Sequence, residues 1–344
     1  MNRYVFMKFA SHFCRLAALV FLLAPHAAQA QSWQATVGAQ SHDMGRQAMA
    51  FLPNEIWIHA GDSVTWKVDS DEIHTVTFLI PAKPGPNPQP AQIRPPFQQG
   101  CPGFLTGAAS FDGSTCVTTA ALAKGQTFTV TFPDAGNFKL VCLVHANMTG
   151  TVHVLDLSQP LPHNQDFYDD QAAAERRALL SDRDTERENN RDEFHSEHVH
   201  IPWNEVRSGV GEIVATPGGA QNLAVMRFME PTKVIHAGET VEWTNSDPVT
   251  RHTITFGIEP ANFMPPSANV TLDADGARHA TINSPSDSVN SGLIVASLHE
   301  RTNVAQAALG VTRFRVTFTH AGVYPYICAI HDNLGMKGEV VVLP

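Results

Sequence analysis

Two segments of this chain are repeated, and this duplication constrains the fold more than any other feature of the sequence. Residues 51–66 (FLPNEIWIHAGDSVTW) align without gaps to residues 228–243 (FMEPTKVIHAGETVEW). Residues 128–145 (FTVTFPDAGNFKLVCLVH) align in the same way to residues 314–331 (FRVTFTHAGVYPYICAIH). An offset of about 180 residues is far longer than the period of a solenoid, so the pattern indicates the tandem duplication of one whole domain.

The local pattern within each copy is typical of β-strands. Apolar and polar residues alternate in IWIHAGDSVTW and VIHAGETVEW around an Ala-Gly-acid turn, which predicts two strands joined by a tight loop. The segments TFTVTF and FRVTFT alternate as well, and an Ala-Gly turn follows each of them. Short strands at this spacing predict an all-β fold, with a Greek-key sandwich or barrel of roughly 100 residues in each copy.

The N-terminus is typical of a secretory signal. Basic residues precede the apolar stretch LAALVFLLA (16–24), and Ala28-Gln29-Ala30 offers the small-x-small pattern of a cleavage site. These nine apolar residues are too few to span a bilayer, which needs about 20. We therefore expect an exported, periplasmic protein without stable membrane insertion; an uncleaved anchor is the alternative. The expected parts are a signal peptide (1–30), a first domain (31–157), a linker (158–207) and a second domain (208–344).

The expected linker differs in composition from the two copies. Residues 165–193 carry many charges of both signs and contain neither Gly nor Pro. This composition predicts a solvent-facing helix whose apolar contacts are limited to Phe167, Tyr168, Leu179 and Leu180. For the second half of this segment, a disordered chain is an open alternative. The net charge of −10 argues against a nucleic-acid partner, since such partners are bound by basic surfaces.

Each copy contains one cysteine, two histidines and one methionine in matching places. The first copy has C-x2-H-x2-M and the second C-x2-H-x4-M, each with a further histidine upstream in IHTVTF or RHTITF. One thiolate, two imidazoles and a thioether form the ligand set of a trigonal copper site with a weak axial methionine. The predicted ligands are His74, Cys142, His145 and Met148 in the first copy, and His252, Cys328, His331 and Met336 in the second.

These motifs resemble those of the blue copper proteins, the cupredoxins. The first loop looks like that of amicyanin and the second like that of plastocyanin, and the resemblance covers about residues 32–156 and 208–344. It implies two cupredoxin sandwiches, two type 1 coppers per chain and no catalytic residues. It also implies that His145 and His331 lie near the surface within an apolar patch, where electrons enter and leave.

The predicted function is therefore one-electron transfer between redox partners, such as a c-type cytochrome or another oxidoreductase. A copper-binding or copper-tolerance protein is the first alternative, although the exposed Met or His clusters expected of one are missing from the sequence. A two-domain copper oxidoreductase, of the nitrite reductase or multicopper oxidase type, is the second. Such an enzyme needs further histidine ligands, and the one His-x-His motif, at His198 and His200, lies in the expected linker.

Several other residues carry weaker expectations. Cys101 and Cys116 are expected to form a disulfide, because export favours oxidation and the other mature cysteines are predicted ligands. The proline-rich stretch 80–97 follows the strand of His74, and we expect it to overhang the first site. For His59 and His236, which match between the copies, a structural role is expected. The linker histidines, His195, His198 and His200, are expected to be exposed, with an accessory metal site as the alternative.

Overall fold

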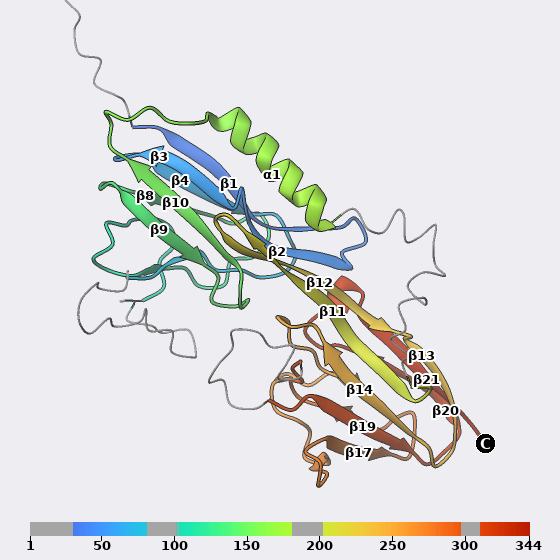
Figure 1. Ribbon diagram of the computed structural model, residues 1–344. Helices are drawn as coiled ribbons and strands as arrows, with labels where there is room; N and C mark the ends of the chain where they lie inside the picture. The colour runs from blue at the N-terminus through green and yellow to red at the C-terminus, as the bar shows by residue number, and fades with distance from the viewer. Residues whose placement is uncertain (1–29, 81–100, 102, 181–201, 297–309) are drawn as a thin grey trace, which may run out of the picture.

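The computed structural model describes residues 30–80, 101, 103–180, 202–296 and 310–344 (Figure 1). Two β-sandwich units follow each other along the chain, with one α-helix between them, which confirms the predicted all-β, two-domain fold. The signal segment, apart from its last residue, lies outside the described residues. So do the linker histidines and the proline-rich stretch from residue 81 onwards. Among the described helices, none is long and apolar enough to cross a membrane.

The first unit consists of two packed layers of strands. Strands within them alternate buried and accessible side chains, as in β4, where Val64, Trp66 and Val68 are buried. One layer contains β1 (Ser32–Gln40), β2 (Arg46–Leu52), β4 (Ser63–Val68), β6 (Gly107–Ser110) and β8 (Thr127–Thr131). The other contains β3 (Glu55–His59), β5 (Thr77–Phe78), β7 (Val117–Thr118), β9 (Gly136–Val141) and β10 (Thr149–Leu155).

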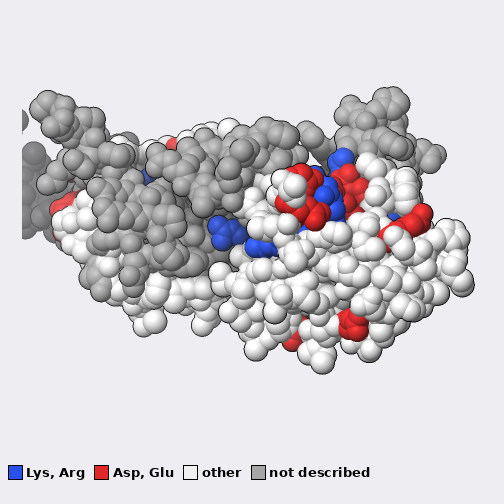
Figure 2. Space-filling model, turned by 90° about the horizontal axis from the view of Figure 1, so that it is seen from below, with Lys and Arg blue, Asp and Glu red and all other residues white. Residues whose placement is uncertain are grey.

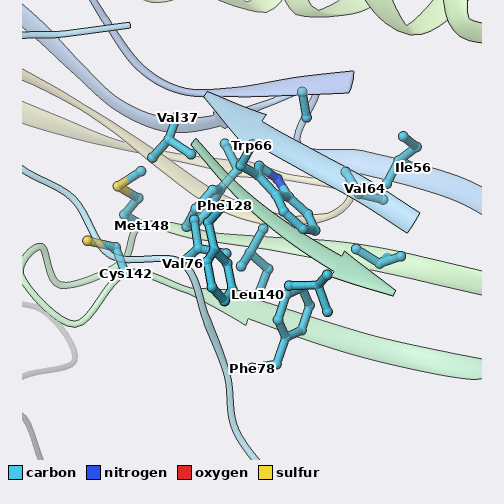
Figure 3. Packing of buried hydrophobic residues seen from close by; sticks show 14 of the residues in the cluster. Val37, Ile56, Val64, Trp66, Val76, Phe78, Phe128, Leu140, Cys142 and Met148 are labelled. Carbon is cyan, nitrogen blue, oxygen red and sulfur yellow. The ribbon is translucent and has the colours of Figure 1, made fainter. Parts of the chain in front are cut away.

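The core of the first unit lies between these layers. Trp66 of β4 packs against Phe78 of β5, with 5.6 Å between the ring centroids. Burying side chains of this size stabilises the unit by about 1.5–3 kcal/mol each. Figure 3 shows Cys142 and Met148 together at one end of this cluster, apart from Phe78. Two of the predicted metal ligands, Cys142 and Met148, are therefore part of the packed core of the sandwich.

The second unit repeats this arrangement, with β16 as an additional strand beside β17. Trp243 takes the place of Trp66 and packs against Phe256, again at 5.6 Å. One layer contains β11 (Glu205–Thr216), β12 (Gly219–Met229), β14 (Thr240–Ser246), β16 (Thr271–Leu272), β17 (Arg278–Ile282) and β19 (Arg313–Phe318). The other contains β13 (Thr232–His236), β15 (Thr255–Phe256), β18 (Val289–Asn290), β20 (Gly322–Ile327) and β21 (Lys337–Leu343). Because β11 begins at Glu205, the first strand of the second unit starts inside the segment 158–207 that was expected to be a linker.

The predicted tight loop after β3 connects the two layers and does not close a hairpin. Gly61 has φ of 95°, a conformation that favours glycine. On either side of it, β3 pairs in parallel with β10, whereas β4 pairs with β1 and β8. Ile58 and Trp66 thereby reach the same core from opposite layers.

The two units are joined edge to edge. Strand β2 pairs antiparallel with β12, with Met49 opposite Asn222, and β10 contacts β12 at Thr149 and Ala220. The pairing makes a continuous network of 16 strands through the described residues of both units. Figure 1 shows β11 and β12 running from the first unit into the second. Pairing of this kind gives hydrogen-bond partners to the backbone N–H and C=O groups that an edge strand otherwise leaves unpaired.

Helix α1 (Gln165–Leu180) lies along β1 and β2 of the first unit (Figure 1). The predicted helix is confirmed over Gln165–Leu180, the part of the predicted segment that the structure describes, but it is less solvent-facing than expected. Tyr168 is buried and contacts the backbone of Trp57 through its hydroxyl, and Leu179 is buried against small residues of β1 and β2. Of the other two predicted contacts, Phe167 is exposed and Leu180 is half-buried.

Candidate metal centres

The first candidate centre combines residues that are far apart in the sequence. His74 precedes β5, Cys142 follows β9, and His145 lies in the loop that leads to β10. One ligand atom from each lies within 4.8 Å of the others, and all three side chains are buried. The Cys142 Sγ atom is 3.8 Å from His145 Nδ1. His74 Nδ1 is buried and has no hydrogen-bond partner, as expected of a nitrogen that is reserved for a metal.

The loop of the first centre is fixed by backbone hydrogen bonds. The Cys142 amide donates to the Met148 carbonyl at 3.0 Å, which closes the loop between the two residues. Thr75, just before β5, supports the cysteine: its amide donates to Cys142 Sγ at 3.5 Å, and its hydroxyl accepts from the Leu143 amide at 2.8 Å. Contacts to the sulfur and its neighbours orient the ligand before any metal arrives.

The second candidate centre repeats this geometry with a longer loop. Cys328 Sγ lies 3.4 Å from His331 Nδ1 and 3.8 Å from His252 Nδ1, and the two Nδ1 atoms are 3.1 Å apart. The additional residues before Met336 form a short 3-10 helix, η1 (Asp332–Leu334), which ends at Gly335 with φ of 93°. The longer loop therefore returns Met336 to the place that Met148 occupies in the first unit, with its carbonyl 3.1 Å from the Cys328 amide.

A glycine makes room for the upstream histidine in each unit. A Cβ atom at Gly38 of β1 would lie 2.5 Å from His74 Nε2, and one at Gly209 of β11 would lie 2.3 Å from His252 Nε2. Each glycine also has a positive φ, 69° and 74°, at an irregularity of its strand. These two positions were not predicted; their signal in the sequence is a glycine inside a strand pattern, which often marks a bulge or a close approach.

The surroundings of the cysteines favour the thiolate form. Burial raises the pKa of Cys142, but hydrogen bonds and charges from His145 and His74 outweigh it and hold this pKa well below the ordinary value. Burial likewise raises the pKa of Cys328, and His331 and His252 outweigh it. The thiolate is the form of cysteine that binds metals. Both clusters thus favour the thiolate form of their cysteine, which is the form that a copper site needs from this ligand.

The donor set at both centres fits copper. One thiolate and two imidazole nitrogens converge in a buried space, and this combination suits copper in both of its oxidation states. Met148 and Met336 are completely buried, and their backbone atoms pair with those of the cysteines. Their role as axial ligands remains a prediction. Among the described residues, these are the two groups of three or more His, Cys, Asp or Glu that converge in this way.

A buried carboxylate lies between the two centres, and sequence reasoning missed it. Glu72 Oε1 lies 3.4 Å from His145 Nε2, and Glu72 Oε2 lies 3.5 Å from His331 Nε2. Burial raises the pKa of Glu72, but the hydrogen bond with His145 and the charges of the nearby histidines outweigh it and lower this pKa to about 2. Its only signal in the sequence is an acidic residue two positions before His74, where the second copy has Thr250 before His252.

The expectation that His145 and His331 lie near the surface is wrong. Their exposed fractions are 3% and 1%, because each faces the junction between the units. Leu334, which follows His331 in the second loop, is 1% exposed and packs into the core cluster of the first unit. Asn222 of the second unit donates to the Ala146 carbonyl in the first loop at 2.9 Å. Each unit thus covers part of the other's metal-binding loop.

The remaining predicted residues lie away from the two centres. Cys101 and Cys116 form the expected disulfide, with 4.8 Å between their Cα atoms. His59 and His236 hydrogen-bond to the carbonyls of Gln159 and Pro344. These contacts agree with the structural role expected of both histidines.

Comparisons with known proteins relate both units to one family of copper-binding proteins. The family model of copper-binding proteins, plastocyanin/azurin family, matches residues 39–155 and 215–343, which is more than half of the chain. A solved reduced mutant of amicyanin is 18% identical, covers 36% of this chain and 82% of its own, and has a TM-score of 0.24. Oxidised plastocyanin from Dryopteris crassirhizoma is 18% identical, covers 40% of this chain and 99% of its own, and has a TM-score of 0.22.

The family match falls on both units and leaves out helix α1 and the segment around it. A comparison with curated proteins returned no match. The matched regions contain all eight predicted ligand residues, and six of these form the two buried clusters. The chain therefore belongs to the plastocyanin/azurin family of copper-binding proteins, with one family domain in each half.

Proposed function

We propose that this protein is an exported blue copper protein that holds two type 1 coppers and transfers single electrons between redox partners. The observation that carries the proposal is the buried His-Cys-His cluster, which occurs in both units with the same supporting contacts. Copper in such a site supplies one-electron chemistry by alternating between Cu(I) and Cu(II).

The chain's own residues contribute a rigid setting for this chemistry. Thr75 and Thr253 donate backbone N–H groups to the two cysteine sulfurs, at 3.5 and 3.4 Å. The ligand side chains are almost completely excluded from water. Ligands that are held in place in this way need little rearrangement when the charge at the site changes, which favours fast electron exchange.

For the partner we propose a c-type cytochrome or another oxidoreductase. Because both loop histidines are buried, a partner would approach through the half-buried neighbours Leu143, Val144 and Ile330. The net charge of −10 would attract a partner with a basic docking surface, and salt would slow the association. On the face in Figure 2, acidic and basic side chains occur together, with neutral surface over most of the other described residues. Attraction then depends on the net charge of the molecule more than on one acidic patch of this face.

The two alternatives from the sequence remain second candidates. A copper-tolerance protein would use the same clusters to store metal without a defined redox partner. A nitrite reductase or multicopper oxidase would need a further copper with an open coordination position. The described residues offer only the two cysteine-containing clusters, and the linker histidines lie outside them.

Copper content and the visible spectrum of the oxidised mature protein test the proposal. We expect two coppers per chain and an intense thiolate-to-copper absorption band. Cys142→Ser and Cys328→Ser should each remove one copper, and the double variant should remove the band. More than two coppers would favour the enzyme, and colourless copper or zinc would favour metal storage. Electron-transfer rates with a candidate cytochrome that do not change with salt would argue against the proposed docking.

A further inference from the structure

Glu72 is the point of contact between the two candidate centres. It belongs to the first unit, yet its two carboxylate oxygens face histidines of different units, 3.4 Å from His145 Nε2 and 3.5 Å from His331 Nε2. All three side chains are buried. A single side chain therefore contacts one predicted ligand of each metal site.

The orientation of the two rings explains what this contact does. In both, Nδ1 faces the cysteine sulfur, 3.8 Å away at His145 and 3.4 Å away at His331. The opposite nitrogen, Nε2, faces Glu72. A carboxylate that faces Nε2 favours a proton on that nitrogen, and this leaves the lone pair of Nδ1 for a metal. Glu72 thus selects the same ring orientation at both sites.

Because Glu72 is buried, its ionised carboxylate needs partners that compensate for the loss of water. An ionised carboxylate that is removed from water is costly unless charged or hydrogen-bonding partners surround it. Its ion-pair partners are the two histidines, one from each unit. The second copy has no carboxylate at the matching position: Thr250 lies two residues before His252, where the first copy has Glu72 two residues before His74. One carboxylate therefore serves both sites.

We infer that Glu72 is a shared positioning residue, through which the first unit controls the metal affinity of both sites. The inference rests on the proposed metal sites and adds a dependence between them. A substitution in the first unit should weaken metal binding by the second. Loss of a carboxylate that orients a metal-ligating histidine typically weakens metal binding by about 10- to 100-fold.

Copper titration of single-site variants measures this dependence. In the metal-free mature chain, Cys328→Ser leaves the first site and Cys142→Ser leaves the second, and each is titrated with Cu(II) with and without Glu72→Gln. We expect Glu72→Gln to weaken both sites by about 10- to 100-fold. Glu55→Gln is the matched control: Glu55 lies 2.8 Å from His153 Nε2, and His153 pairs with Asn137 near the start of β9, whereas Cys142 follows the end of that strand. Loss of the Glu55 carboxylate should therefore leave both affinities unchanged.

Imidazole NMR of the metal-free protein gives a readout that does not depend on copper. In the unmodified chain, Nε2 of both His145 and His331 should carry a proton that exchanges slowly with water. Glu72→Gln should shift the Nε2 signals of both rings and leave that of His153 in place, whereas Glu55→Gln should do the reverse. A bare Nε2 in either ring of the unmodified chain would overturn the inference, even if no Glu72 variant folds.

The outcomes separate this inference from the proposed function. If Cys142→Ser and Cys328→Ser leave copper binding intact, the proposed sites fail, whatever Glu72 does. If the sites are confirmed but Glu72→Gln weakens only the first, or neither, then the shared role of Glu72 is wrong. Glu72→Leu removes the polar group at similar volume, and unfolding curves of both variants distinguish a local effect from a loss of folding.

Discussion

Asn222 of the second unit donates a hydrogen bond from its side-chain nitrogen to the carbonyl of Ala146, at 2.9 Å. Ala146 lies in the loop between His145 and Met148, so a residue of one unit fixes the metal-binding loop of the other. Asn222 is completely buried on β12, opposite Met49 of β2. The junction between the units is thus part of the first candidate site.

Replacing Asn222 by alanine should loosen the first loop. Loss of a buried hydrogen bond costs about 1 kcal/mol, and the Ala146 carbonyl would be left without this partner. We expect a lower free energy of unfolding in urea and a changed thiolate-to-copper band in the Cys328→Ser background, which isolates the first site. Asn245→Ala is the matched control: Asn245 donates to the Thr250 and Ile294 carbonyls beside the second site, so its loss should leave the band of the first site unchanged. An altered second site in Asn222→Ala would contradict this local explanation.

Gly38→Ala should weaken copper binding at the first site alone, and Gly209→Ala should weaken it at the second site alone. At Gly38 the new methyl group would collide with His74, and at Gly209 with His252. Each substitution also places a side chain at a positive φ, so together we expect losses of more than about 1 kcal/mol. Copper stoichiometry should fall from two to one in each single variant. Gly61→Ala is the control: it strains the backbone at a similar φ but meets no atom within 4 Å.

The sequence predicted the repeated sandwich and the three side chains that converge in each cluster. Both predictions rest on patterns that repeat, namely alternation along strands and a Cys-His loop that occurs twice. The disulfide between Cys101 and Cys116 was predicted from a different argument, the oxidising compartment and the absence of another partner, and it is confirmed.

The junction between the units was not predicted, because its residues follow no repeat. Glu72 has no counterpart in the second copy, and its role depends on where His331 lies in space. The burial of both loop histidines depends on the pairing of β2 with β12, and strand pairing between distant segments leaves little trace in one sequence. One signal was present: β2 is apolar over AMAFL, as in a strand that is covered on both faces.

The two sites should differ in reduction potential. In the first, His74 Nε2 contacts the hydroxyl of Ser70 at 3.0 Å, whereas His252 Nε2 faces the carboxylate of Asp247 at 4.0 Å. The loops before the two methionines also differ in length. A redox titration of the fully loaded protein should therefore show two one-electron steps, and a single step for both sites would contradict this prediction.

Asp247→Asn tests the cause of that difference. Burial raises the pKa of Asp247, so the potentials are compared at a pH where this carboxyl is ionised. Its negative charge beside a ligand then favours the more highly charged Cu(II), and its removal should raise the potential of the second site. The shift is about 60 mV for each tenfold change in the relative affinity for the two oxidation states. Measured with Cys142→Ser, the second site should shift upward. Measured with Cys328→Ser, the first site should stay unchanged, because the Asp247 carboxylate faces His252 and accepts hydrogen bonds from the amides of Val249 and Thr250.

Tyr168 should make the protein sensitive to alkaline pH. Burial against Trp33, together with the charge of Glu55, raises the pKa of this tyrosine to about 12, despite its hydrogen bond with the backbone of Trp57. Because the folded pKa lies above the ordinary value of 10.0, the folded state favours the neutral phenol. Its contribution to stability is complete below pH 10 and is lost as the pH rises through 12.

Tyr168→Phe separates this contribution from those of other tyrosines. At neutral pH the variant should be less stable by about 1 kcal/mol, since Phe lacks the hydroxyl that contacts the Trp57 backbone. Between the ordinary and the raised pKa, unmodified Tyr168 loses part of its advantage while Phe does not titrate. The two unfolding free energies, measured in urea, should therefore converge as the pH rises. A difference that stays constant over this range would show that the Tyr168 phenol has the same pKa in the folded and unfolded chains.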